Sequence, residues 1–127
     1  MEIPVGTSLK KTMTVENKHL ARTLGSGGLD VYGTPAMITF MEETSLNAVQ
    51  QFLPETSSTV GTVVNVRHLK SSPLGATITC EAVVKEVDGR RINFDVKAFD
   101  SAGDLIGEGT HERFVIDIER FMAKLAK

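Results

Sequence analysis

One stretch decides the fold of this chain: Thr34-Pro-Ala-Met-Ile-Thr-Phe-Met-Glu-Glu-Thr-Ser-Leu-Asn-Ala-Val-Gln-Gln-Phe-Leu53. It predicts a single long helix of about 18 residues, roughly 27 Å in length. Thr34 is suited to cap the N-terminus, and Pro35 to occupy the first helical position, where its missing N–H costs nothing. Pro54 ends the helix because its ring disfavours helical geometry in the residue before it.

The expected helix has two different faces. Its polar stripe contains Thr39, Glu43, Asn47 and Gln50, and its apolar stripe contains Ile38, Leu46, Val49 and Leu53. Glu42 falls inside the apolar stripe, where a carboxylate must be paired, hydrogen-bonded or protonated because an isolated buried charge is costly. Two interpretations of Glu42 are therefore open. It is either a structural glutamate bonded to a helix terminus or a nearby arginine, or a carboxylate tuned by burial for acid–base chemistry.

The composition favours a soluble globular protein of one domain, residues 1–127. Hydrophobic residues make up 41% and charged residues 24% of the chain. A net charge of −2 and the absence of Trp give no reason to expect nucleic acid as a partner. No signal peptide or membrane-crossing apolar run is visible, and the single cysteine, Cys80, is expected to be a small buried apolar residue. We therefore expect a cytoplasmic protein with no membrane partner.

Beyond the long helix the apolar period changes from helical to two, which predicts strands. Before the helix we expect a strand over 9–16, a helical turn over 17–21, and a mobile glycine-rich connector over 23–30 that could act as a lid. After it we expect strands over 60–69, 76–85, 92–98 and 105–117, with turns at 71–75, 88–89 and 100–104, and a basic helical tail over 118–127. Hairpin-linked strands indicate an antiparallel sheet. With one long central helix on its face, this predicts an α+β hotdog fold in which the sheet curls around the helix.

His68 lies near the end of the strand over 60–69, on the face that Val64 and Val66 share. A lone histidine on an apolar face is more often a core residue than a catalyst. The presence of Thr34 and Glu42 in the same small chain favours the catalytic interpretation. Hydroxyl, carboxylate and imidazole together are the groups of an activated-nucleophile or activated-water site.

The chain resembles the hotdog-fold thioesterases related to fluoroacetyl-coenzyme A thioesterase. The resemblance rests on Val31-Tyr-Gly-Thr34 with Met41-Glu42, Gly61-Thr-Val-Val-Asn-Val-Arg-His68, Val87-Asp-Gly-Arg-Arg91 and Gly107-Glu-Gly-Thr-His-Glu-Arg113. It implies a thioester hydrolase that acts on acyl-coenzyme A (acyl-CoA) as a homodimer, with the active site near the subunit interface. It also implies no metal and no cofactor, since coenzyme A is part of the substrate.

By this resemblance Thr34, Glu42 and His68 are the catalytic residues, and the backbone amide of Gly61 polarises the thioester carbonyl. Glu42 would act as base on water or on the Thr34 hydroxyl, or as the nucleophile itself, while His68 orients and protonates. Arg113 is the second expected substrate-site residue, through pairing with a buried carboxylate or contact with a coenzyme A phosphate.

Two further points concern the basic and metal-ligating residues. Lys70, Lys124 and Lys127 are alternative phosphate contacts. The stretch His111-Glu112-Arg113 lacks the paired histidine spacing of a zinc motif, so we expect no metal site.

The spacing of Thr34 and Glu42 raises a geometric question. On one continuous helix, eight residues separate them by about 12 Å of rise. Direct cooperation then needs either a segment before the helix that folds back and carries Thr34, or one residue of the pair from the other subunit.

The segment before Thr34 differs from that of the fluoroacetyl-specific members, which carry phenylalanines there that form a hydrophobic lid. Here Gly25-Ser-Gly-Gly28 has no aromatic residue until Tyr32. We therefore expect an ordinary short or medium acyl-CoA as the substrate. The alternative is a non-catalytic hotdog module that binds acyl-CoA or another small apolar ligand, and a hotdog dehydratase is a weaker third interpretation.

Overall fold

A computed structural model describes residues 2–126 of the chain. Its five strands are β1 (Ser8–Thr14), β2 (Ser57–His68), β3 (Thr77–Asp88), β4 (Arg91–Phe99) and β5 (Leu105–Asp117). They form one antiparallel sheet in the order β1-β3-β4-β5-β2. The helical segments are η1 (Asn17–His19), α1 (Ala21–Leu24), α2 (Thr34–Gln50) and α3 (Ile118–Leu125). The strands, the turn at Gly89 and the short helical turn after β1 agree with the sequence-based expectation within a few residues.

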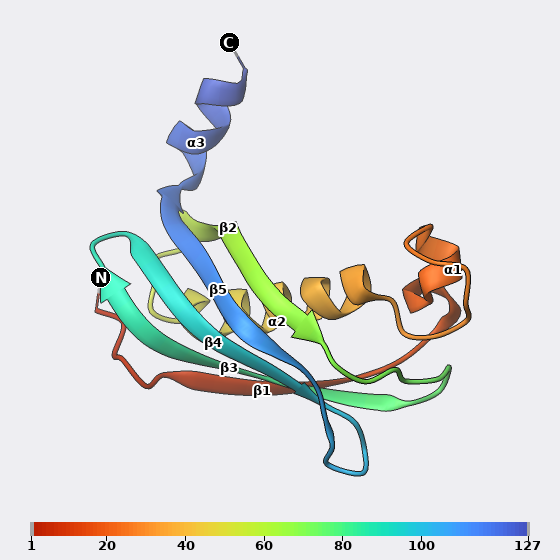
Figure 1. Ribbon diagram of the computed structural model, residues 1–127. Helices are drawn as coiled ribbons and strands as arrows, with labels where there is room; N and C mark the ends of the chain where they lie inside the picture. Colours follow the sequence, from red (N-terminus) through yellow and green to blue (C-terminus); the bar gives the residue numbers. More distant parts are fainter. Residues whose placement is uncertain (1, 127) are drawn as a thin grey trace.

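The sheet curls around α2, which crosses its concave face (Figure 1). This confirms the predicted hotdog fold. The core lies between α2 and the inward-facing residues of the two central strands, which alternate as the sequence predicted. These residues are Ile78, Cys80, Ala82 and Val84 of β3, and Ile92, Phe94, Val96 and Ala98 of β4, all fully buried. Cys80 is thus a buried apolar residue, as expected.

The expected boundaries of α2 were wrong at both ends. The N-cap is Gly33, and Thr34 is already helical, so the Thr34 hydroxyl does not cap the helix. It is hydrogen-bonded to His68 instead. The helix ends at Gln50, and the three residues before Pro54 form a turn.

The expected apolar stripe of α2 was also wrong, except at Val49, which is buried. The face that packs on the sheet contains Ala36, Met37, Phe40, Met41, Thr44, Ser45, Ala48 and Val49, while Ile38, Leu46 and Leu53 are only half-buried. Thr44 and Ser45 are tolerated there because their hydroxyls donate to the carbonyl oxygens of Phe40 and Met41 within the helix. Glu42 therefore lies on the flank of α2, beside the core and not inside it.

The two edge strands are β1 and β2. On β2 the five residues 61–65 are exposed, and the pairing with β5 shifts register between Gly61 and Val63, which marks a bulge. An unpaired strand edge with exposed residues such as Val63 and Val64 is a surface suited to pairing with another strand.

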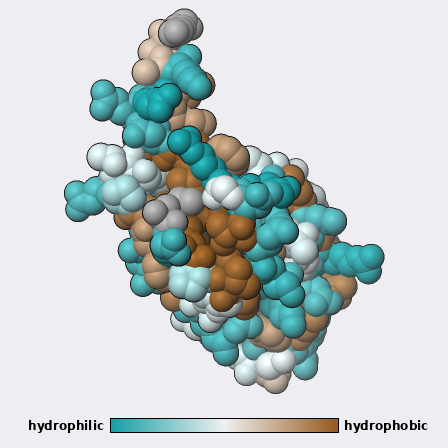
Figure 2. Space-filling view, turned by 90° about the vertical axis from the view of Figure 1, so that its left-hand side faces the viewer, coloured by the Kyte–Doolittle hydropathy of each residue, from teal (hydrophilic) through white to brown (hydrophobic). Residues whose placement is uncertain are grey.

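The C-terminal helix α3 projects away from the body of the protein (Figure 1). Its residues Ile118, Met122 and Leu125 are exposed, and Figure 2 shows further hydrophobic residues gathered on the body below it. Lys127, part of the expected basic tail, lies outside the described residues. Over residues 2–126, the helices are too short or too polar to cross a membrane.

Candidate active site

The first half of the candidate site is a hydroxyl–imidazole pair. Thr34 is the first residue of α2 and His68 the last residue of β2, and Thr34 Oγ1 lies 2.8 Å from His68 Nδ1. The ring of Tyr32 packs edge-on against the imidazole, with 6.1 Å between the centroids. Burial lowers the pKa of His68, which favours the neutral ring at pH 7. With its proton on Nε2, this ring would accept a hydrogen bond from Thr34 Oγ1 through Nδ1, which is the arrangement of an activated nucleophile.

The second imidazole nitrogen of His68 is poised for another contact. Nε2 is buried and makes no hydrogen bond of good geometry among the described residues, although the Lys70 backbone lies near enough to raise the pKa of the ring. A buried polar atom of this kind normally has a partner, so Nε2 is a candidate for contact with a ligand.

The second half of the site is the carboxylate of Glu42 beside Gly61. A Cβ placed on Gly61 would lie only 2.6 Å from Glu42 Oε2, so the carboxylate occupies the space that a side chain would need. The same oxygen lies 3.6 Å from Nη1 of Arg113, and the Glu42 side chain is 40% exposed. Glu42 is thus paired with a nearby arginine, as the structural interpretation expected, and its carboxylate also remains accessible to a ligand.

Arg113 is fixed by three hydrogen bonds. Its Nε donates to Thr59 Oγ1 at 2.8 Å, its Nη2 to the Thr59 carbonyl at 2.9 Å, and its Nη1 to His111 Nε2 at 3.1 Å. The residue is only 6% exposed. Of the two expected roles, the structure shows pairing with a carboxylate, since a buried and fully engaged guanidinium is not available to a coenzyme A phosphate.

Lys70, an expected alternative phosphate contact, and His111 both have protein partners. Lys70 donates to the carboxylates of Asp100 and Asp104, at 2.8 and 2.7 Å. His111 uses both ring nitrogens, since its Nδ1 lies 2.7 Å from the Val63 carbonyl oxygen and its Nε2 accepts from Arg113. The sequence singled out His111 only as a possible metal ligand, and its place beside Arg113 follows from the register of β2 and β5.

The structure leaves the two halves of the site apart within one chain. Thr34 and Glu42 both belong to the continuous helix α2, about 12 Å apart along its axis. Gly61 and His68 are separated by about 23 Å along β2. The alternative in which Thr34 precedes the helix on a segment that folds back is therefore wrong.

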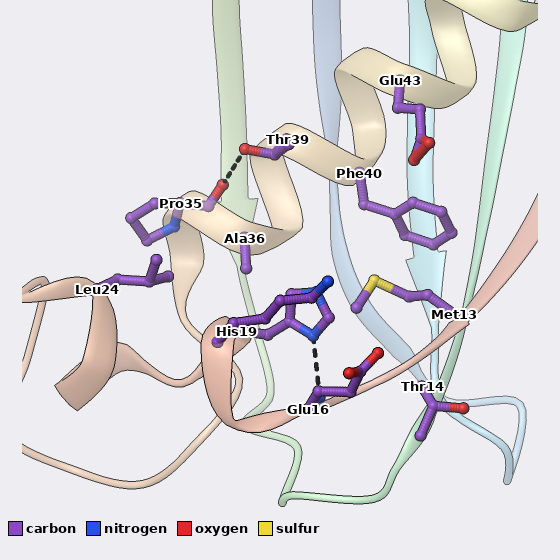
Figure 3. A pocket seen from close by; sticks show the side chains of 11 residues that line it. Met13, Thr14, Glu16, His19, Leu24, Pro35, Ala36, Thr39, Phe40 and Glu43 are labelled. Atoms are coloured by element: carbon purple, nitrogen blue, oxygen red, sulfur yellow. Dashed lines mark hydrogen bonds between the residues drawn. The ribbon is translucent and has the colours of Figure 1, made fainter.

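A cavity of about 550 Å³ lies on the other flank of α2, where the helix begins (Figure 3). Met13, Leu24, Pro35, Ala36 and Phe40 form its apolar wall, and Glu16, Lys18, His19 and Glu43 are among its polar lining residues. None of the five expected site residues lines it. No local sequence signal predicts this cavity because β1, η1, α1 and α2 meet there only in the folded chain.

Fold and site together define a hotdog protein with hydroxyl, imidazole and carboxylate groups around an exposed edge strand. Comparison with known proteins shows to which family of hotdog proteins the chain belongs. Residues 15–119 match the family described as fluoroacetyl-CoA-specific thioesterase. The fluoroacetyl-CoA thioesterase of Streptantibioticus cattleyicolor is 38% identical over 96 residues, which cover 76% of this chain and 68% of that enzyme. The chain therefore belongs to the fluoroacetyl-CoA-specific thioesterase family, and the expectation of a thioester hydrolase is confirmed at this level.

Solved structures agree with this assignment. A structure of fluoroacetyl-CoA thioesterase superimposes with a TM-score of 0.93 at 32% identity, covering 99% of this chain and 97% of that one. A threonine-to-serine variant of that enzyme, solved in complex with acetyl-CoA, gives a TM-score of 0.92 at 32% identity, with 98% and 97% of the two chains covered.

Proposed function

We propose that this protein hydrolyses short or medium acyl-CoA thioesters at a site that two copies of the chain build together. The observation that carries the proposal is the 2.8 Å contact between the Thr34 hydroxyl and a His68 ring that burial keeps neutral, in a member of a thioesterase family. One related enzyme has been solved with acetyl-CoA bound, which supports an acyl-CoA as the substrate class.

In the proposed reaction, His68 takes the proton of Thr34 while Thr34 Oγ1 attacks the thioester carbonyl carbon. The tetrahedral intermediate collapses, the carbon–sulfur bond breaks, and His68 returns the proton to the departing coenzyme A thiolate. Glu42 then takes a proton from water while the water oxygen attacks the carbonyl carbon of the Thr34 ester. The bond from that carbon to Thr34 Oγ1 breaks, Thr34 Oγ1 receives the proton held by Glu42, and the free acid leaves. The amide of Gly61 is the proposed donor to the oxyanion in both steps. The route uses only side chains and backbone of the protein, with no metal or cofactor.

The proposed homodimer explains how the two halves of the site meet. Pairing of β2 with β2 of a second copy across a two-fold axis would be antiparallel. With the axis near Val64, the end of β2 that carries His68 in one copy lies level with Gly61 and Glu42 in the other. The exposed residues 61–65 of β2 are the part of the edge that such pairing would cover.

The glycine-rich segment before α2 supports an ordinary acyl group. Gly25 and Gly28 lie in an exposed segment, and a Cβ at either position would meet no atom within 4 Å. Space is therefore open where the fluoroacetyl-specific members are expected to place aromatic side chains. We propose that this segment leaves room for acyl groups larger than fluoroacetyl.

The test is thiol release from a series of acyl-CoA thioesters of increasing length, with wild type and Glu42→Gln compared. The proposal predicts hydrolysis by wild type, and in the variant an acyl group trapped on the peptide that contains Thr34, detected by mass spectrometry. An adduct on Glu42 in wild type would replace Thr34 by Glu42 as the nucleophile.

The second candidate function, a non-catalytic module for acyl-CoA or another small apolar ligand, is favoured by one observation, the cavity that the candidate catalytic residues do not line. Calorimetric binding of an acyl-CoA that remains intact after long incubation would support the module and contradict the enzyme. We further propose that residues 1–127 form a single hotdog thioesterase domain that acts in the cytoplasm, where the thiol of Cys80 would remain reduced.

A further inference from the structure

We infer that His111 is a positioning residue of the thioesterase site, which holds Arg113 against Glu42 and fixes the β2 bulge at Gly61 through one neutral imidazole ring. This inference rests on the proposed function. The sequence motifs assigned no site role to His111. Its positioning role follows from the contacts of its two ring nitrogens.

The hydrogen bonds determine the protonation state of the ring. The Val63 carbonyl oxygen, 2.7 Å from Nδ1, can only accept a hydrogen bond, so Nδ1 carries a proton. Nη1 of Arg113, 3.1 Å from Nε2, can only donate, so Nε2 carries none. His111 is therefore the neutral Nδ1–H tautomer, and a second proton on Nε2 would point at the guanidinium.

The ring of His111 contacts both Arg113, which lies beside Glu42, and the strand segment that contains Gly61. Through Nε2, His111 orients the same Arg113 nitrogen that lies 3.6 Å from Glu42 Oε2. Through Nδ1 it is bonded to Val63, the residue after the register shift that begins at Gly61. A Cβ on Gly61 would also lie 3.2 Å from His111 Cε1, so the ring forms part of the wall around the Gly61 backbone.

The surroundings of His111 favour the neutral ring. It is only 2% exposed, and it stacks on Phe94 of β4 with 6.2 Å between the ring centroids. Burial is the main cause that lowers the pKa of His111, and the positive charge of Arg113 lowers it further. The hydrogen bond to the Val63 carbonyl raises the pKa of His111 and opposes this shift most strongly, and the carboxylates of Glu42 on α2 and Glu112 on β5 oppose it further. Protonation at acidic pH would place two cations side by side and break the hydrogen bond that orients Nη1 of Arg113, while the two bonds from Arg113 to Thr59 remain.

Two variants separate this role from simple packing. His111→Gln can donate its amide N–H to Val63 and accept from Arg113 with its amide oxygen, so it keeps both bonds without a titrating ring. His111→Phe keeps the stacked ring on Phe94 but loses both bonds. We expect kcat for a cleaved acyl-CoA to fall about ten- to a hundredfold in the phenylalanine variant, because small displacements of catalytic groups are costly. The kcat of the glutamine variant should stay within a few-fold of wild type. Because glutamine does not titrate, its kcat should also fall less at acidic pH than that of wild type.

A second measurement does not depend on activity. Nitrogen-15 NMR of the imidazole, assigned by comparison with His111→Gln, should show a neutral Nδ1–H ring at pH 7 that resists protonation below pH 6.5. Equal kcat in wild type and a folded phenylalanine variant, or an Nε2–H ring in the spectrum, would overturn the inference. Loss of kcat in the glutamine variant as large as in the phenylalanine variant would also overturn it. If wild type cleaves no thioester, the proposed function fails, and the NMR spectrum still decides the arrangement of His111.

Discussion

Thr34 Oγ1 and His68 Nδ1 lie 2.8 Å apart, although 34 positions separate the two residues in the sequence. The contact forms because α2 begins where β2 ends, so the first side chain of the helix meets the last side chain of the strand. Tyr32 packs edge-on against the imidazole. The pair is therefore placed by the backbone of two rigid elements.

Replacement of Thr34 separates the role of its hydroxyl from that of its shape. Thr34→Val keeps the branched side chain and removes the oxygen, so thiol release should fall by at least about a hundredfold if this oxygen attacks the substrate. Thr34→Ser keeps the oxygen and should retain measurable activity. Steady-state kinetics on one acyl-CoA is the measurement, and equal activity of the valine variant and wild type would remove Thr34 from the mechanism.

The pH dependence of the reaction should follow His68. In the proposed mechanism the neutral ring is the base, and burial lowers the pKa of His68 below the ordinary 6.5. Activity should therefore be complete above pH 6.5 and should decline as the pH falls through the lowered pKa of His68. A profile of kcat/KM from pH 4.5 to 8, recorded in the His111→Gln background to remove the second histidine, tests this. An acidic limb at or above pH 6.5 would contradict the assignment.

Mixed dimers test whether the site is shared between subunits. Glu42→Ala and His68→Ala should each be inactive alone. In a mixed dimer, one site receives an intact Thr34–His68 pair from one subunit and an intact Glu42 from the other, so an equal mixture should regain about one quarter of wild-type activity.

The matched control for the mixed dimers is a mixture of Thr34→Val with His68→Ala. Both changes lie in the same half of the site, so no mixed dimer contains an intact site. Recovery in this control, absence of recovery in the test pair, or a monomeric protein at micromolar concentration would contradict a shared site.

Gly61→Ala should reduce activity more than it reduces stability. The new methyl group would lie 2.6 Å from Glu42 Oε2, and the partly exposed carboxylate can move away, so the main result is displacement of Glu42. Gly28→Ala is the matched control for stability because a Cβ there meets no atom within 4 Å. The measurements are thiol release by Gly61→Ala and wild type, and thermal unfolding of Gly61→Ala, Gly28→Ala and wild type. Unchanged kcat in Gly61→Ala would show that Glu42 does not need its observed position.

Gly109→Ala should lower the free energy of unfolding by about 1–3 kcal/mol, the usual cost of overpacking. A Cβ at this position would contact the carbonyl oxygen of Asn65 on the neighbouring strand, and backbone of that kind cannot move aside as a flexible side chain can. Urea denaturation is the measurement, again with Gly28→Ala as the control. Equal midpoints for the two variants would contradict the close approach of β2 and β5.

The sequence alone determined the secondary structure and, through it, the fold class. Alternating apolar residues in 76–84 and 92–98 predicted the buried faces of β3 and β4, since only every second residue of a strand faces the core. Asp88-Gly89 predicted the hairpin, where Gly89 has the positive φ of 61° that glycine adopts most readily. The roles expected for Thr34, Glu42, His68 and Gly61 came from the resemblance to a thioesterase family, and they stay proposals.

Tertiary structure decided which side of α2 each residue occupies and which partners it meets. Apolar residues recur at helical spacing both in the expected stripe of Ile38 and Leu46 and in the buried face of Met37 and Met41. Periodicity alone therefore does not tell which of the two faces is buried. Only contact with the curled sheet chooses between them, and it places Glu42 on the flank of the helix next to β2. The pairing of β2 with β5 brought His111, Arg113 and Thr59 to Glu42 from distant positions. No local pattern encodes such contacts, because strand register depends on the packing of the whole sheet.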